Sequence, residues 1–110
     1  MGSVQAFDIR AALIVTVTGE LDLATAPRLA GALREATSPI DHVVIDLSQA
    51  TFLDSPSLSA LITARRELAA RAIRMHVVSP PEHLITRVFE ITRLIAELRV
   101  VGSVDEALAS

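Results

Sequence analysis

The sequence predicts an α/β domain with a mixed sheet of four to five strands and about four helices mainly on one face. Apolar residues alternate through residues 11–18, the period-two pattern of a strand. Residues 43–47 form a nearly continuous apolar run, which is typical of an inner strand buried on both faces. Amphipathic segments at helical spacing separate the later strands, so parallel neighbours joined by right-handed crossovers are expected.

The first half of the chain contains two predicted strands and one predicted helix. Residues 4–9 are a weaker strand candidate, which a short turn near Arg10 would pair with residues 11–18. Thr25 is predicted to cap the helix that follows, and Pro27 falls in its first turn. The apolar face of this helix consists of Ala26, Leu29, Leu33 and Ala36.

The second half begins with the inner strand at residues 43–47, and a long amphipathic helix is predicted from Ser55. Residues 73–77 alternate again and predict another strand. Because two of the strands alternate, the second face of the sheet is expected to be only partly covered.

Two capping boxes are predicted near the end of the chain. Residues 79–82 would open a helix that carries apolar residues through Phe89. Residues 98–101 are a candidate edge strand, and residues 103–106 would start a short final helix through Leu108.

Length and composition indicate one globular domain over residues 1–110. The chain has 110 residues, of which 51% are hydrophobic and 21% charged, in the range of ordinary globular proteins. The opening Met1-Gly2-Ser3 has the composition of a cloning remnant and carries no weight in the prediction.

The charge distribution, the apolar runs and the lack of cysteine argue against several kinds of partner, location and site. The chain has 13 acidic and 10 basic residues and no continuous basic stripe, which argues against direct nucleic-acid binding. No apolar run approaches the roughly 20 residues of a membrane span, and no leader-like segment opens the sequence. We therefore expect no membrane insertion and a cytoplasmic location. Without cysteine, the chain can form neither disulfides nor thiolate metal sites.

The sequence lacks the usual patterns of catalytic and cofactor sites. His42, His76 and His83 have no partners at metal-ligand spacing, and we interpret them as solvated or structural. The four glycines cannot form a phosphate loop or a dinucleotide fingerprint. Glu20 and Asp22 are two residues apart, which is more typical of a solvated turn than of an acid–base pair. We expect no metal, no cofactor and no enzymatic activity.

The segment from Asp46 to Leu61 leads from the inner strand into the long helix. Its simplest interpretation makes Ser55 the N-cap, Pro56 the first helical residue and Asp54 an acid favoured by the helix dipole. The carboxyl ends of parallel strands and the following helix N-termini gather at one edge of a sheet. We therefore expect one cluster there, formed by Glu20, Asp22, Thr25, Asp54, Ser55 and Ser57.

This segment resembles the signature of the STAS domain of anti-sigma factor antagonists, an Asp-Leu-Ser stretch followed by an aromatic residue, Leu or Met, and Asp-Ser-Ser-Gly-Leu. Here the corresponding residues are Asp46-Leu47-Ser48 and Phe52-Leu53-Asp54-Ser55-Pro56-Ser57-Leu58, with Pro56 at the second serine of the motif and Ser57 where glycine is usual. Two flanking stretches are also similar to the family and occur in its order, namely Gly19 to Pro27 and Phe89 to Leu94, with Arg93 where glycine is usual. The resemblance covers nearly the whole chain.

The resemblance implies a protein that binds a serine kinase acting as an anti-sigma factor and so frees a sigma factor. It places the partner-binding surface at Glu20, Asp22, Thr25, Asp54, Ser55, Pro56 and Ser57. In the family, phosphorylation of the second serine of Asp-Ser-Ser-Gly ends the binding. Pro56 occupies that position and has no hydroxyl, so constitutive binding is expected, with Ser57 and Ser55 as the remaining candidate phospho-acceptors.

Two other functions stay open as hypotheses. The same fold serves as a cytoplasmic accessory subunit of membrane complexes that transport anions or lipids. A nucleotide-hydrolysing enzyme is disfavoured, because the chain lacks a phosphate loop and a metal constellation. Weak self-association is also left open.

Overall fold

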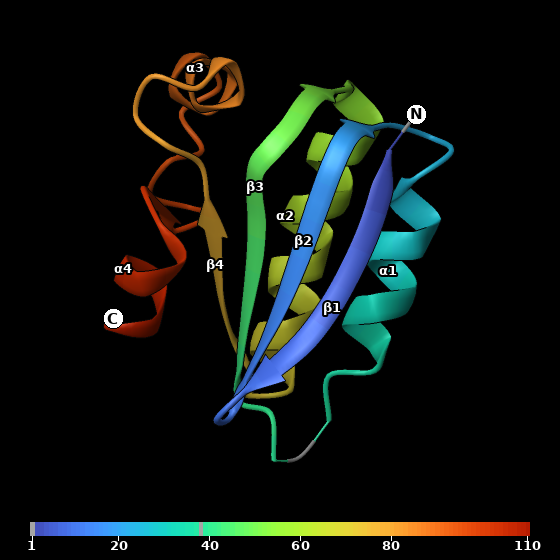
Figure 1. The fold of residues 1–110 in the computed structure, drawn as a ribbon, viewed down its shortest axis with the longest axis vertical. Helices are drawn as coiled ribbons and strands as arrows, with labels where there is room; N and C mark the ends of the chain where they lie inside the picture. The colour runs from blue at the N-terminus through green and yellow to red at the C-terminus, as the bar shows by residue number, and fades with distance from the viewer. Residues whose placement is uncertain (1, 38) are drawn as a thin grey trace.

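The computed structural model describes residues 2–37 and 39–110 and contains a five-stranded sheet in the order β1-β2-β3-β4-β5 (Figure 1). β1 and β2 pair antiparallel, and each later neighbour pairs parallel. The strands are β1 Ser3–Ile9, β2 Ala12–Leu21, β3 His42–Leu53, β4 Arg74–Val78 and β5 Val100–Val101. The helices are α1 Ala26–Arg34, α2 Ser55–Ala70, α3 Leu84–Ile91 and α4 Val104–Leu108. The predicted α/β class and mixed sheet are confirmed.

The two faces of the sheet are covered unequally. α1, α2 and α3 contribute to the main core, in which alternate residues of β2 such as Leu13 and Val15 are fully or almost fully buried. The intervening residue Ile14 points to the second face, where it belongs to a smaller cluster with Val44 of β3 and Ala107 of α4. Figure 1 shows α1 and α2 together behind the sheet and α4 apart from them. Helices therefore lie mainly on one face, as predicted.

β2 and β3 run further than the apolar patterns predicted. Their pairing shifts register between Thr16 and Thr18 and again between Gly19 and Glu20, which marks irregularities in the ladder. Gly19 has a φ of 79°, in the left-handed region that glycine adopts without steric cost. Beyond these shifts the two strands pair again. Polar residues that follow the predicted apolar runs therefore still belong to β2 and β3.

The predicted start of α3 is wrong, whereas that of α4 is confirmed. The N-cap of α3 is His83, whose Nδ1 accepts a hydrogen bond from the Ile85 N–H at 3.0 Å. The Ser79 hydroxyl is instead buried in a hydrogen bond with the Thr86 hydroxyl. In α4, the Ser103 hydroxyl accepts from the Glu106 N–H at 3.1 Å, as a capping residue should.

Gly2 and Ser3, two residues of the predicted cloning remnant, are built into the fold. Ser3 pairs with Thr18 at the start of β1, and Gly2 is buried. A Cβ atom on Gly2 would lie 2.0 Å from the Glu20 carbonyl oxygen, so only glycine allows this close approach. Met1 lies outside the described residues. Within the described ranges, no helix is both long and apolar enough to cross a bilayer.

Candidate functional site

The predicted site residues come together where β2 and β3 end. Glu20 faces Phe52 in the ladder, and the Asp54 N–H donates a hydrogen bond of 3.3 Å to the Leu21 carbonyl. The Thr51 hydroxyl lies 3.4 Å from Glu20 Oε2, to which it donates. The loop before α1 and the start of α2 therefore lie next to each other, as the topology predicted.

The turn between β2 and α1 is held by Thr25. Its hydroxyl donates to the Glu20 carbonyl at 2.7 Å and accepts from the Asp22 N–H at 2.9 Å. Thr25 occupies the N-cap position of α1, but its side chain makes no capping bond, because the hydroxyl is already engaged with the preceding turn. Since Thr25 is also 4% exposed, it positions this turn and is not available to a partner.

The N-cap of α2 is Asp54 and not Ser55, which corrects the predicted assignment. Asp54 has extended backbone angles, φ −88° and ψ 168°, and its Oδ1 accepts from the Ser57 N–H at 2.8 Å. Ser55 and Pro56 are therefore the first and second helical residues, and both are exposed. An aspartate caps a helix as well as a serine does, and β3 delivers residue 54 in the extended conformation that a cap requires.

Ser57 is the second correction, because the sequence predicts it as a candidate phospho-acceptor and its hydroxyl is buried. It is 1% exposed, and its hydroxyl makes no hydrogen bond of acceptable geometry to any residue described in the structure. The hydroxyl still lies close enough to Asp54 to lower the pKa of that carboxyl, ahead of the Ser57 N–H as the second cause. Of the two candidate phospho-acceptors, only Ser55 is open to solvent.

Two exposed apolar side chains accompany the acidic residues. Leu23, in the turn after Asp22, is 73% exposed, and Phe52, opposite Glu20, is 50% exposed. Exposure of large apolar groups beside charges is typical of protein-binding surfaces. Phe52 is the aromatic residue of the signature, whereas nothing in the sequence singled out Leu23. We call Glu20, Asp22, Leu23, Phe52, Asp54 and Ser55 the acidic edge.

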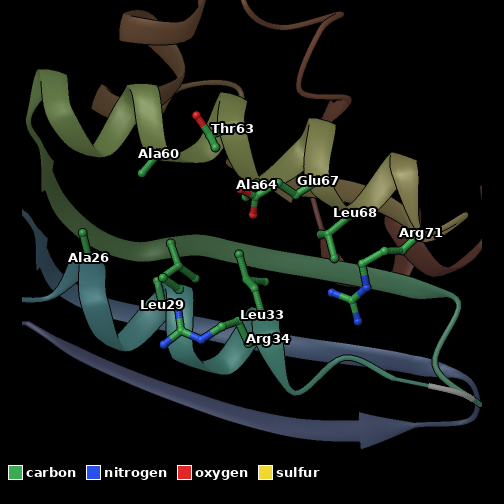
Figure 2. Close-up of a pocket in the computed structure, with 11 residues that line it drawn as sticks. Ala26, Leu29, Leu33, Arg34, Ala60, Thr63, Ala64, Glu67, Leu68 and Arg71 are labelled. Atoms are coloured by element: carbon green, nitrogen blue, oxygen red, sulfur yellow. The ribbon is translucent and has the colours of Figure 1, made fainter.

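A groove of about 460 Å³ lies between α1 and α2 and is lined mainly by alanine and leucine side chains (Figure 2). Arg71 reaches across from the end of α2 and donates to the Ala36 carbonyl. Glu67 supplies the one carboxylate in the lining, and no histidine lines the groove. Over residues 2–37 and 39–110, no three His, Asp or Glu side chains are grouped as a metal would require. The groove thus offers no acid–base pair or metal site.

Solved structures of other proteins share this fold. An anti-sigma factor antagonist from Mycobacterium paratuberculosis is 27% identical in sequence, with a TM-score of 0.85 over 99% of this chain and 92% of its own. The phosphorylated Bacillus cell fate determinant SpoIIAA is 19% identical, with a TM-score of 0.66 over 94% of each chain. A sulfate transporter family protein from Wolinella succinogenes is 20% identical, with a TM-score of 0.76 over 90% of this chain and 83% of its own. The latter two likenesses concern the fold alone.

Comparison at the level of sequence families gives a match over almost the whole chain. No curated protein sequence matches it significantly. Residues 4–107 match the STAS domain, in agreement with the signature at residues 46–58 and with the five-stranded sheet. The chain therefore belongs to the STAS domain family.

Proposed function

We propose that this STAS domain is a bacterial, cytoplasmic anti-sigma factor antagonist. It binds an anti-sigma factor that is also a serine kinase, thereby frees a sigma factor, and so regulates transcription without touching DNA. The observation that carries the proposal is the acidic edge, where the turn after β2 and the start of α2 form one surface. The likeness to the Mycobacterium paratuberculosis antagonist, which extends over nearly the full length of both chains, supports it.

The chemistry of the acidic edge favours binding to a protein. Glu20, Asp22 and Asp54 supply three carboxylates, and Leu23, which follows Asp22, and Phe52, opposite Glu20, supply exposed apolar surface beside them. A partner with basic side chains around an apolar centre would complement both properties. Because its hydrogen bonds lower the pKa of Asp54, this carboxyl stays ionised at neutral pH. It is a poor general base there, which supports binding over catalysis.

The position of Pro56 favours constitutive binding over a phosphorylation cycle. Proline has no hydroxyl, and the serine that follows is buried, so neither residue can accept a phosphoryl group in the folded protein. Ser55 is exposed but lies one residue earlier, which on a helix is a rotation of roughly 100° and a rise of about 1.5 Å. That displacement misaligns it for in-line transfer in a kinase that is shaped for residue 56.

Affinity capture with matched charge reversals tests the proposal. Wild-type protein, Asp54→Lys and Glu35→Lys would each be immobilised and exposed to a lysate of the source organism. Glu35 is exposed at the opposite end of α1, so its reversal changes net charge equally without altering the acidic edge. We expect wild type and Glu35→Lys to retain an ATPase-domain serine kinase, and Asp54→Lys to lose it.

Two results would contradict the proposal. Equal retention of the kinase by Asp54→Lys would mean that binding occurs elsewhere on the molecule. Recovery of transporter subunits, with no ATPase-domain kinase, would instead support the accessory role in a membrane transport complex.

A further inference from the structure

A pair of buried histidines lies on the second face of the sheet, away from the acidic edge. His42 on β3 and His76 on β4 are 3% and 6% exposed. Nε2 of His42 and Nδ1 of His76 are 2.7 Å apart, within hydrogen-bond distance, and the two rings meet edge to face. The parallel register brings them together, because His76 lies opposite Val44, two residues after His42.

α4 covers this face beside the histidine pair. Its buried residue Ala107 packs with Val44 and Val78, which occupy the same face of β3 and β4 as the pair. His42 lines a depression of about 540 Å³ together with Asp105 and Leu108 of α4, and this depression is open to solvent. α4 has five residues, too few to hold a helix without tertiary contacts, so its order depends on this packing.

The hydrogen bond between the rings restricts how many protons the pair can carry. In the neutral pair, one ring nitrogen donates its N–H and the facing nitrogen accepts it through its lone pair. A first added proton leaves this bond intact but creates a buried cation. A second proton puts an N–H on both facing nitrogens, which breaks the bond and sets two charges against each other.

The charges around the pair mostly oppose its protonation. Those that act on the two rings, or line the same depression, are Arg74 from β4, Arg99 before β5, Arg65 from α2, Asp41 before β3, Arg10 from the β1–β2 turn and Asp105 from α4. Asp46 on β3 and Glu106 on α4 each accept a hydrogen bond from a backbone N–H. Burial, followed by Arg74, lowers the pKa of His42 to about 4, and burial, followed by Arg99, lowers the pKa of His76.

We propose that the His42–His76 pair is a proton-sensitive latch, which holds α4 against the second face of the sheet at neutral pH and releases it on acidification. Release would uncover the apolar residues Ile14, Val44 and Val78 beneath α4. This device is independent of the acidic edge and therefore does not rest on the proposed function.

The direction of the pH dependence follows from the lowered pKa values. With α4 released, the histidines gain contact with solvent and their pKa values rise towards the ordinary value near 6.5, so the released form binds protons that the closed form resists. The latch is therefore most stable at pH 7.5 and above, and it weakens as the pH falls through 6.5 towards 4. For His42 alone, a pKa of about 4 in the closed form and full recovery to 6.5 on release set an upper limit of roughly 30-fold on the rise in opening between pH 7.5 and pH 5.

Hydrogen exchange on the full chain tests the latch. Protection factors, corrected for the intrinsic exchange rate at each pH, would be measured for the amides of α4 and β3 at pH 7.5 and pH 5. In wild type we expect protection of α4 to fall by up to about 30-fold while β3 keeps its protection.

A double variant removes titration but keeps the hydrogen bond. His42→Gln retains a polar group at the position of Nε2, and His76→Asn retains one at the position of Nδ1, so the two amides can still pair. We expect α4 of this variant to keep its protection at pH 5. His83→Asn is the matched control, since His83 caps α3, a role that Asn also fills, and it should respond to pH as wild type does.

Three results would overturn the latch. In wild type, α4 could be equally protected at both pH values, or α4 and β3 could lose protection together, which would mean global unfolding. The third is a double variant with the wild-type pH response. Should that variant not fold, NMR titration of the wild-type imidazoles decides, because ordinary pKa values in both rings with α4 still protected would equally contradict the proposal.

Discussion

The acidic edge and the buried histidine pair contain groups whose pKa values are lowered, with opposite consequences. The nearby hydroxyl of Ser57 and the hydrogen bond from its backbone N–H lower the pKa of Asp54, and an acid with a lowered pKa stays charged. Burial lowers the pKa values of His42 and His76, and a base with a lowered pKa stays neutral. The same direction of shift thus keeps a charge at the surface and keeps charge out of the interior.

The difference shows where this small domain can meet another protein. At the acidic edge the charge is satisfied by a backbone N–H of its own helix and still faces solvent, so a basic partner can approach it. The histidine pair satisfies its own hydrogen bond on the second face of the sheet, beside α4, and presents no charge at neutral pH. Substitutions at the two places should therefore separate effects on binding from effects on stability.

The largest effect is expected from a charge at Ser57, the buried serine next to the acidic edge. Ser57→Asp would place a carboxylate at a position that is 1% exposed and adjacent to Asp54, and should destabilise the fold by about 3 kcal/mol. Ser55→Asp, at an exposed position near the helix N-terminus, should leave stability almost unchanged. Urea denaturation of both variants measures the difference. A Ser57→Asp protein as stable as wild type would show that the site is open after all.

Breaking the histidine pair should have a smaller effect. His76→Ala leaves a buried nitrogen of His42 without its partner and should cost about 2 kcal/mol at pH 7.5. The double variant His42→Gln with His76→Asn keeps a hydrogen bond and should be clearly more stable than His76→Ala. Denaturation midpoints at pH 7.5 give the comparison, and equal midpoints would mean that the bond between the rings contributes nothing.

Removal of the α2 cap should cost less again. Asp54→Ala loses the acceptor for the Ser57 N–H and should destabilise the fold by about 1 kcal/mol, whereas Asp54→Asn keeps a capping oxygen and should lose only a few tenths. Thermal unfolding of the two variants tests this order. A destabilisation of Asp54→Asn as large as that of Asp54→Ala would imply that the charge, and not the cap, supports the helix.

The smallest structural change is expected at the residue that replaces the usual phospho-acceptor. Pro56→Ser should lower stability by about 0.5 kcal/mol, because serine leaves the unfolded chain more flexible than proline does. Incubation with the cognate kinase and ATP should phosphorylate this variant at residue 56 and leave wild type unmodified, as mass spectrometry would show. Stoichiometric phosphate on wild-type Ser55, with loss of binding, would show instead that the switch had moved by one residue.

The class of the fold, the order of most elements and the cluster at the ends of β2 and β3 could all be predicted from periodicity and topology. The ends of elements were less predictable. Asp54 and Ser55 are both good caps, and only the extended backbone at residue 54 decides between them. The capping box at residues 79–82 was wrong because the Ser79 hydroxyl pairs with Thr86, a tertiary contact that no local pattern reveals.

Burial of single polar residues was the least predictable property. Ser57 lies in a polar stretch of sequence that suggests exposure. In the structure it is the third residue after the Asp54 cap, in the first turn of α2, and its side chain is buried. His42 and His76 are separated by 34 residues, and their contact depends on the register of β3 with β4. Leu23 carries no signal at all, since its exposure follows from the shape of a turn and not from its neighbours in sequence.

The binding affinity of Asp54→Asn for the captured kinase tests the central claim most directly. This variant keeps the cap, the fold and the shape of the acidic edge and removes one negative charge. Isothermal titration calorimetry at low ionic strength should show binding at least about tenfold weaker than wild type, with the difference shrinking as salt is added. An affinity equal to that of wild type at low ionic strength would contradict the assignment of the acidic edge as the surface that binds the partner.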